Sequence, residues 1–286
     1  MRAETEKNSY TQAIMLHIVS WTCFKGAIME NQELVLLERQ DGIAIVTLNR
    51  PSSLNALSIS LRNRLAETFK EIASDGKTKV VILTGSGRAF TVGLDLKELG
   101  GEIEASGKIE SDVAKAMSSV RVPIIGAING YAITGGFEIA LMCDFLIGTP
   151  NAKFADTHAR VGVVPGWGLS QRLPRIIGIN RARELSLTGN FLDAETACSW
   201  GLLNRIVEEE ELIAHCSGLA RDIISTDEAT RTEMRRIINA GWESTLSEGL
   251  IEEKNANRDH GKREVRPEKV AARRNEIQER GRSQAE

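Results

Sequence analysis

One glutamate stands out in the sequence because of the residues around it. Glu138 lies in an otherwise apolar stretch, residues 137–142, shortly after the glycine pair Gly135 and Gly136. A carboxylate among apolar side chains is costly to bury unless it has a partner or a catalytic task, and such a group can act as a general acid or base. Glycines at a helix start leave backbone N–H groups open to a ligand. We therefore expect an oxyanion hole with an acid–base group beside it, with an arginine salt bridge to Glu138 as the alternative.

The elements that would position this glutamate are a buried strand and the helix that the glycine pair opens. Residues 80–84 and 124–128 are short apolar runs, and each is expected to form a buried strand. The alternation of strands and helices predicts an α/β fold with crossover connections. The other expected strands are 34–39, 43–49 and 145–147, and the other expected helices are 58–74, 111–120, 168–178, 180–187, 193–200, 209–225, 227–256 and 268–280.

Several motifs in matching order and spacing resemble the crotonase (enoyl-CoA hydratase/isomerase) family. They are the segments 80–99 and 124–144, Asn49-Arg50-Pro51 with Leu54-Asn55-Ala56-Leu57, and Pro165-Gly166-Trp167-Gly168 with Gln171-Arg172-Leu173. The resemblance covers residues 33–284. It implies a crotonase-like (ClpP/crotonase) α/β spiral of repeated β-β-α units over residues 29–210. A C-terminal helical region, residues 211–286, would then make oligomer contacts and cover coenzyme A (CoA).

The resemblance also implies roles for individual residues. The backbone N–H groups of Leu94 and Gly135 would bind the thioester oxygen, and Glu138 would be one of the two catalytic glutamates of the hydratases. Trp167 would shape the acyl pocket, with ordinary core packing as the alternative. The other positions implied to bind CoA or the acyl group are Ala56 and Leu57 at the adenine, Lys97 near the phosphates, and Gly93, Asp95 and Gly136.

The second catalytic glutamate of the hydratases is missing from this chain. By its offset from Phe154 and Gly162, His158 occupies that position. An imidazole titrates near neutral pH and can act as an acid or a base. A structural histidine bonded to the backbone or to Asp156 is an equal alternative. The sequence therefore does not predict the two-glutamate water site of the hydratases.

The main functional hypothesis is a crotonase-family acyl-CoA enzyme that adds water reversibly to a 2-enoyl-CoA. Because one glutamate is replaced, the alternatives are an enoyl-CoA isomerase, an acyl-CoA hydrolase or a decarboxylase on the same fold, or a catalytically silent acyl-CoA-binding protein. The CoA thioester is the expected substrate, and no metal or other cofactor is expected, since the sequence has no HExxH or Cys/His metal spacing. The resemblance implies a homotrimer or a dimer of trimers.

Composition and charge narrow the partners and the compartment. The chain has 286 residues, of which 42% are hydrophobic and 26% charged, as in ordinary globular proteins. A formal net charge of −3 argues against nucleic acid and acidic membranes as partners. Four cysteines without metal-ligand spacing fit a reducing, cytoplasmic compartment. Residues 1–28 precede the resemblance, and we expect a disordered or artefactual extension there rather than a signal peptide or a membrane span.

Overall fold

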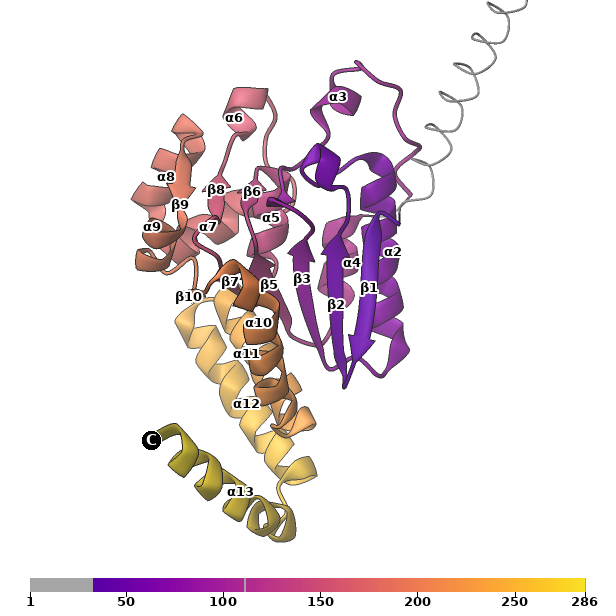
Figure 1. The fold of residues 1–286 in the computed structure, drawn as a ribbon. Helices are drawn as coiled ribbons and strands as arrows, with labels where there is room; N and C mark the ends of the chain where they lie inside the picture. The colour runs from indigo at the N-terminus through magenta and orange to yellow at the C-terminus, as the bar shows by residue number, and fades with distance from the viewer. Residues whose placement is uncertain (1–32, 111, 286) are drawn as a thin grey trace, which may run out of the picture.

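A computed structural model describes residues 33–110 and 112–285, and the prediction for residues 1–28 lies outside the described residues. The strands form two sheets (Figure 1). In spatial order, the six-stranded sheet contains β1 (Val35–Gln40), β2 (Ile43–Leu48), β3 (Val80–Gly85), β5 (Ile124–Ile128), β7 (Phe145–Gly148) and β10 (Arg205–Ile206). The four-stranded sheet contains β4 (Ala89–Thr91), β6 (Tyr131–Ile133), β8 (Lys153–Ala155) and β9 (Phe191–Asp193).

The chain alternates between these two sheets as it winds. The strands β3, β5 and β7 of the larger sheet are each followed by a strand of the smaller one, β4, β6 and β8, and then by helix. Strands from successive turns pair in parallel, with Ile125 opposite Phe145 in the larger sheet and Tyr131 opposite Lys153 in the smaller one. This winding is the predicted spiral of β-β-α units, and the predicted fold class is confirmed.

Helices connect the strands and make up most of the chain after residue 168, as predicted. Ser58 caps the first long helix by accepting a hydrogen bond from the Leu61 N–H at 3.2 Å. None of the helices in the described residues has both the length and the apolar character needed to cross a membrane. The helices are η1 (Pro51–Ser53), α2 (Ile59–Asp75), α3 (Leu96–Leu99), α4 (Val113–Ser119), α5 (Gly135–Leu141), α6 (His158–Val161), α7 (Leu169–Ile177), α8 (Ile179–Thr188), α9 (Ala194–Ser199), η2 (Glu209–Glu211), α10 (Leu212–Ile224), α11 (Glu228–Glu243), α12 (Leu246–Glu264) and α13 (Pro267–Ala285).

Both faces of the larger sheet are covered, because its central strands are apolar on both sides. In β3, Val81 and Leu83 belong to the core shared with α2 and α5. Val80 and Ile82 belong to a second core with α10. Successive side chains of a strand point to opposite faces, so an unbroken apolar strand is what a parallel sheet covered on both sides requires.

The predicted helix over residues 227–256 is wrong in its continuity, because two helices, α11 and α12, occupy this range. Thr245 Oγ1 accepts the Glu248 N–H at 3.3 Å, and the Glu248 carboxylate accepts the Thr245 N–H at 2.9 Å. This reciprocal capping box marks a new helix start. The two helices then pack side by side (Figure 1). The proposed division into residues 29–210 and 211–286 stays a prediction.

Candidate active site

Glu138 lies in the first turn of α5 and is only 3% exposed. Its Oε1 accepts the backbone N–H of Trp167 at 2.7 Å and that of Leu169 at 3.4 Å. Its Oε2 lies 3.4 Å from Nε2 of His158. The partners of this carboxylate are therefore main-chain donors and a histidine, and they replace the arginine salt bridge that the sequence left open.

Two acidic side chains hold the His158 ring between them. Its Nδ1 lies 2.6 Å from Oδ1 of Asp156, opposite the Nε2 that faces Glu138. Burial opposes protonation of the imidazole, but the hydrogen bonds and charges of the two carboxylates outweigh it and raise the pKa of His158 to about 9. This raised pKa favours the protonated ring at neutral pH, with Nδ1 toward Asp156 and Nε2 toward Glu138. His158 is bonded to Asp156, as the structural alternative predicts, and it also contacts Glu138; its catalytic role stays a prediction.

Asp156 belongs to the same cluster, although the sequence indicated it only as a structural partner. It follows β8 directly and is 2% exposed. Burial raises the pKa of its carboxyl group, but hydrogen bonds from His158 and Ser186 hold the pKa below its ordinary value. An aspartate at a strand end, two residues before a histidine, is the sequence signal that indicated this pair.

At the start of α5, the N–H of Gly135 has no hydrogen-bond acceptor among the residues that the structure describes. The first hydrogen bond of this helix runs from the Glu138 N–H to the Thr134 carbonyl at 3.0 Å, so the Gly135 N–H precedes the helical series. A side chain at Gly93 would place its Cβ 2.9 Å from the Gly135 nitrogen. The glycine at position 93, which has φ 85°, therefore lets the two loops approach each other directly.

Leu94 follows Gly93 in the chain, and its N–H points away from Leu57, the residue with which it pairs. Leu57 and Leu94 form an isolated parallel bridge. Its hydrogen bonds run from the Leu57 N–H to the Gly93 carbonyl at 2.8 Å and from the Asp95 N–H to the Leu57 carbonyl at 3.4 Å. In this parallel bridge the residues before and after Leu94 make the hydrogen bonds to Leu57. The N–H of Leu94 itself therefore points away from Leu57. The two predicted oxyanion donors thus lie at the start of α5 and on the loop beside it.

The two glycines at the start of α5 have different surroundings. A Cβ at Gly136 would lie 2.1 Å from the Thr91 carbonyl oxygen, so α5 packs directly on the backbone of β4 there. A Cβ at Gly135 would lie 3.4 Å from Cζ3 of Trp167 and 3.6 Å from Cδ1 of Leu57, which are ordinary contacts. Gly136 is therefore required by packing, whereas Gly135 borders Trp167, the residue expected at the acyl pocket.

The turn between β6 and α5 is strained at Thr134, which the sequence reasoning did not single out. Its backbone has φ 53° and ψ −112°, and a β-branched residue at positive φ is a genuine outlier. Its N–H donates to the Ala155 carbonyl at 2.9 Å, and its hydroxyl is hydrogen-bonded to that of Thr157. Such strain persists only where the surroundings over-determine it. Here they tie the start of α5 to the segment that carries His158.

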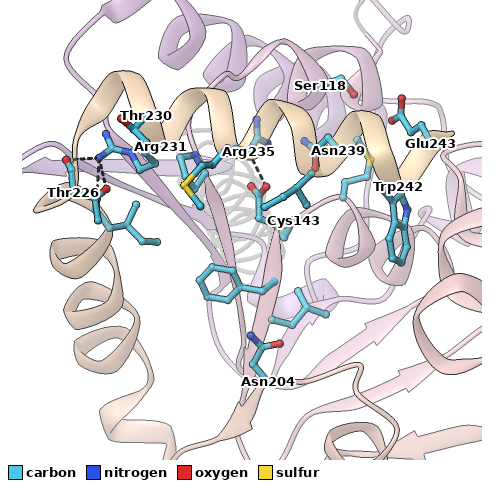
Figure 2. A pocket seen from close by; sticks show the side chains of 18 of the residues that line it. Ser118, Cys143, Asn204, Thr226, Thr230, Arg231, Arg235, Asn239, Trp242 and Glu243 are labelled. Carbon is cyan, nitrogen blue, oxygen red and sulfur yellow. Dashed lines mark hydrogen bonds and ion pairs between the residues drawn. The ribbon is translucent and has the colours of Figure 1, made fainter. Parts of the chain in front are cut away.

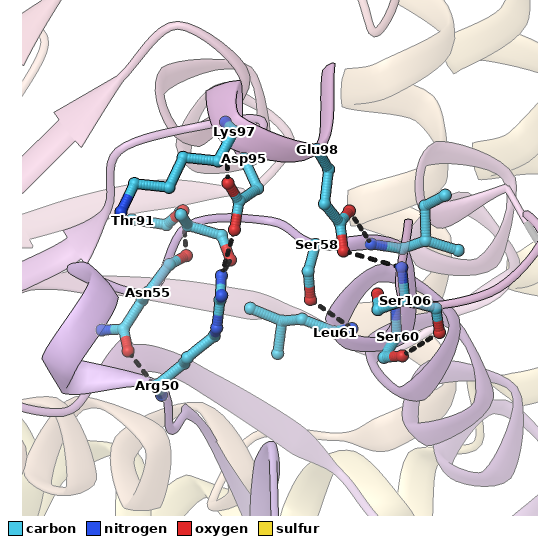
Figure 3. Close-up of polar contacts among 12 residues, drawn as sticks. Arg50, Asn55, Ser58, Ser60, Leu61, Thr91, Asp95, Lys97, Glu98 and Ser106 are labelled. Carbon is cyan, nitrogen blue, oxygen red and sulfur yellow. Dashed lines mark hydrogen bonds and ion pairs between the residues drawn. The ribbon is translucent and has the colours of Figure 1, made fainter. Parts of the chain in front are cut away.

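Arg50 joins the segment predicted at the adenine to the loop that carries Leu94 (Figure 3). Its Nη1 lies 2.5 Å from Oδ2 of Asp95 and donates to the Ala56 carbonyl at 3.1 Å. Asp95 also caps α3 by accepting the Lys97 N–H at 3.1 Å. The carboxylate of Asp95 is thus engaged in holding the loop, while the Lys97 side chain is exposed on α3.

Asn55 is a second residue that the sequence indicated only as part of a motif. It is fully buried and has φ 55°. Its Nδ2 donates to the carbonyls of Ser86 at 3.0 Å and Ala89 at 2.8 Å. Its Oδ1 accepts the Arg50 N–H at 2.8 Å (Figure 3). Asn55 therefore shapes the loop of Ala56 and Leu57, whose N–H groups donate to the carbonyls of Ser53 at 2.9 Å and Gly93 at 2.8 Å. The contact of these two residues with the adenine stays a prediction.

A large cavity of about 1190 Å³ lies apart from these residues, against α11 (Figure 2). It is lined by apolar side chains of α11, including Met234, Ile238 and Trp242, and by residues near β7 such as Cys143 and Asp144. None of the predicted site residues lines it. Across the described part of the chain, no group of three or more His, Cys, Asp or Glu residues is arranged to hold a metal ion.

The fold and this cluster define a class of protein: a spiral α/β protein in which backbone N–H groups at a helix start lie near a buried carboxylate–imidazole pair. Residues 38–272 match the enoyl-CoA hydratase/isomerase family. The chain belongs to this family, and the family predicted from the sequence motifs is confirmed.

Individual relatives agree with this membership. The chain is 44% identical to a probable peroxisomal enoyl-CoA hydratase 1 of Arabidopsis thaliana, over 78% of this chain and 85% of the relative. It is 37% identical to a probable enoyl-CoA hydratase of Mycobacterium bovis, over 78% and 87%. Among solved structures, an enoyl-CoA hydratase subunit of Geobacillus kaustophilus has a TM-score of 0.76 at 29% identity, covering 84% of this chain and 94% of the other. The enoyl-CoA hydratase of Mycobacterium tuberculosis has a TM-score of 0.66 at 39% identity, covering 79% and 98%.

Proposed function

We propose that this protein adds water reversibly across the double bond of a 2-enoyl-CoA. The observation that carries the proposal is the 3.4 Å contact between Glu138 and His158. It lies in the turns of the spiral that also contain Gly135 and Leu94, whose N–H groups would bind the thioester oxygen. Hydration needs a base for water, an acid for the α-carbon and a site for the enolate oxygen. The names of the relatives, which are enoyl-CoA hydratases, support the same reaction.

In the proposed reaction Glu138 is the base and His158 the acid. Glu138 takes a proton from water, whose oxygen bonds to the β-carbon, and the double-bond electron pair moves toward the thioester. The Leu94 and Gly135 N–H groups bind the resulting enolate oxygen, an interaction worth about 3 kcal/mol per donor in other enzymes. The protonated Nε2 of His158 then delivers its proton to the α-carbon.

The site must then return to its starting state. After one turnover Glu138 holds the proton taken from water and His158 has lost its own. Because Oε2 and Nε2 lie 3.4 Å apart, the proton can pass between them directly or through one water molecule. Water thus supplies both groups added to the substrate, the hydroxyl at the β-carbon and the hydrogen at the α-carbon, and no other reactant is consumed. The proposal needs no metal or other cofactor.

A comparison of three variants on crotonyl-CoA tests the proposal. Glu138→Gln and His158→Ala are each expected to lower kcat for hydration about 10²- to 10⁴-fold, the usual contribution of a positioned acid or base. His260→Ala is the matched control, because His260 lies on α12 and contacts Thr230. The assay follows the enoyl-thioester absorbance and the product mass. Full activity of His158→Ala would contradict the assignment of the acid.

The replacement of a glutamate by His158 also keeps a second group of functions open. An isomerase needs only proton shuttling, and a hydrolase or decarboxylase uses the same oxyanion hole. Product mass separates them from hydration, because isomerisation conserves mass, hydrolysis frees CoA and decarboxylation releases carbon dioxide. CoA binding without turnover on a panel of acyl-CoA thioesters would instead support a silent binding protein.

We also propose that the protein forms a homotrimer or a dimer of trimers. Met234, Ile238 and Trp242 are spaced four residues apart on α11 and are 54%, 64% and 46% exposed. They border the cavity in Figure 2. A contiguous exposed apolar row of this kind marks an interaction surface, and a second copy of the chain is the proposed occupant.

The cytoplasm remains the proposed compartment. Two relatives carry other compartments in their names, a peroxisomal one from Arabidopsis thaliana and a mitochondrial one from Dictyostelium discoideum. Fractionation of the native cells, with detection of the endogenous protein, tests this proposal. Recovery in an organelle fraction would contradict it.

A further inference from the structure

We propose that Asp156 is a positioning residue that orients His158 and keeps it protonated, so that the acid of this site is an imidazolium rather than a carboxylic acid. The inference rests on the proposed function, because His158 is the acid only if the site hydrates an enoyl-CoA. It concerns a residue that the proposed reaction does not itself use, since Asp156 contacts the side of the ring opposite Glu138.

The geometry around Asp156 fixes the ring in one orientation. Its Oδ1 accepts the backbone N–H of His158 at 3.2 Å and lies 2.6 Å from Nδ1 of the same residue. One carboxylate oxygen therefore binds both the backbone and the ring of a residue two positions later. With Nδ1 held as a donor, Nε2 is the nitrogen that faces Glu138.

A second set of contacts fixes this segment relative to Glu138. The Ala155 carbonyl, directly before Asp156, accepts the Thr134 N–H at 2.9 Å. The hydroxyl of Thr157 is hydrogen-bonded to that of Thr134, the residue that precedes α5. The segment from Ala155 to His158 is thus tied on both sides of Asp156 to the turn that begins the helix of Glu138. The row of contacts from Asp156 through His158 to Glu138 is therefore held in one arrangement.

The charges that face the ring explain its protonation. Glu138 from α5 and Asp156 from the end of β8 contact the two ring nitrogens. From α8, Ser186 adds a hydrogen bond to Asp156. On α6 itself, the Arg160 guanidinium donates to the Thr188 carbonyl at 2.7 Å. The two carboxyl groups and the His158 ring are buried together, and a negative charge beside a ring nitrogen stabilises the imidazolium.

Asp156→Asn tests the inference, because asparagine can still accept from Nδ1 but carries no charge. The titration of the His158 ring can be followed by NMR of histidine-labelled protein, with the His158 signal assigned by its loss in His158→Gln. In Asp156→Asn the midpoint of this titration is expected to fall by about one to three pH units. In the pH profile of kcat for crotonyl-CoA, the pH at which kcat falls on the alkaline side should decrease by the same amount, with KM little changed. Asp193→Asn, which alters the N-cap of α9, is the matched control and should leave both midpoints in place.

The outcomes separate this inference from the proposed function. An unchanged His158 midpoint in Asp156→Asn would overturn the inference, whatever the activity. A lowered midpoint in a protein that hydrates no enoyl-CoA would overturn the proposed function and support the electrostatic role of Asp156. If the variant does not fold, titration of the wild type decides. A His158 midpoint near the ordinary value of about 6.5 would overturn the inference, and one near 9 would support it.

Discussion

The adjoining glycines Gly135 and Gly136 are expected to respond in opposite ways to the same change to alanine. In Gly136→Ala the new Cβ would lie 2.1 Å from the Thr91 carbonyl oxygen and 2.9 Å from its Cγ2, so α5 or β4 has to move. Overpacking of this kind costs about 1–3 kcal/mol. At about 2–4 °C per kcal/mol for a chain of this size, Tm should fall by about 2–12 °C.

Gly135→Ala should keep its stability and lose activity. Its Cβ would meet Trp167 at 3.4 Å and Leu57 at 3.6 Å, which are ordinary contacts. Alanine is also the better helix former, by up to about 1 kcal/mol. The methyl group would, however, fill the space between the Gly135 N–H and the loop of Leu94. We expect kcat to fall about 10²- to 10³-fold, the effect of losing one oxyanion donor.

The two variants are compared by thermal unfolding and by crotonyl-CoA hydration under the same conditions. Each serves as the control for the other, because the substitution is identical and the positions are adjacent. A Gly136→Ala protein with the same Tm as the wild type would refute the packing argument. A Gly135→Ala protein with undiminished kcat would refute the placement of the oxyanion hole.

Three further predictions concern pH, the Arg50 ion pair and the exposed face of α11. His158 has a pKa of about 9 in the folded state, above its ordinary 6.5. Its contribution to the free energy of unfolding is therefore complete below about pH 6.5 and is lost as the pH rises through about 9. The free energy of unfolding in urea should therefore differ less between pH 6 and pH 9 for His158→Gln than for the wild type. Arg50→Met leaves the buried Asp95 without its cation and should cost about 2 kcal/mol by urea unfolding, whereas Arg64→Met, which breaks only exposed pairs, should cost less than about 1 kcal/mol. Ile238→Glu should shift the protein to smaller species in light scattering after gel filtration, with its circular dichroism unchanged, and an unaltered mass would contradict the proposed use of this face.

Much of the fold was predictable because its signals are local. The apolar run at residues 124–128 forms β5 as predicted. Ser58 caps α2 as its residue type indicates. The division between α11 and α12 was missed because helical spacing continues through Ser244. The capping box of Thr245 and Glu248 interrupts that spacing and starts α12.

The candidate site was predictable where a single segment contains the chemistry. Glu138 was found because a lone carboxylate in an apolar helix is conspicuous, and the glycine pair before it indicates a helix start near a ligand. The strain at Thr134 was not found, since a threonine gives no sign that its φ will be positive. Asp95 shows the same limit, because its pairing with Arg50 joins residues far apart in the chain.

By itself the sequence determined the family, five of the six strands of the larger sheet and the residue types available for catalysis, but not the three-residue strands of the smaller sheet. These follow from spacing along one chain, where neighbouring residues are in contact whatever the fold. Only the tertiary structure decided what surrounds His158. Its ring lies between Asp156, two residues before it, and Glu138 on another turn of the spiral, and the charges of both carboxylates together outweigh burial and protonate it. A pKa depends on the distances to every nearby charge, and folding sets those distances.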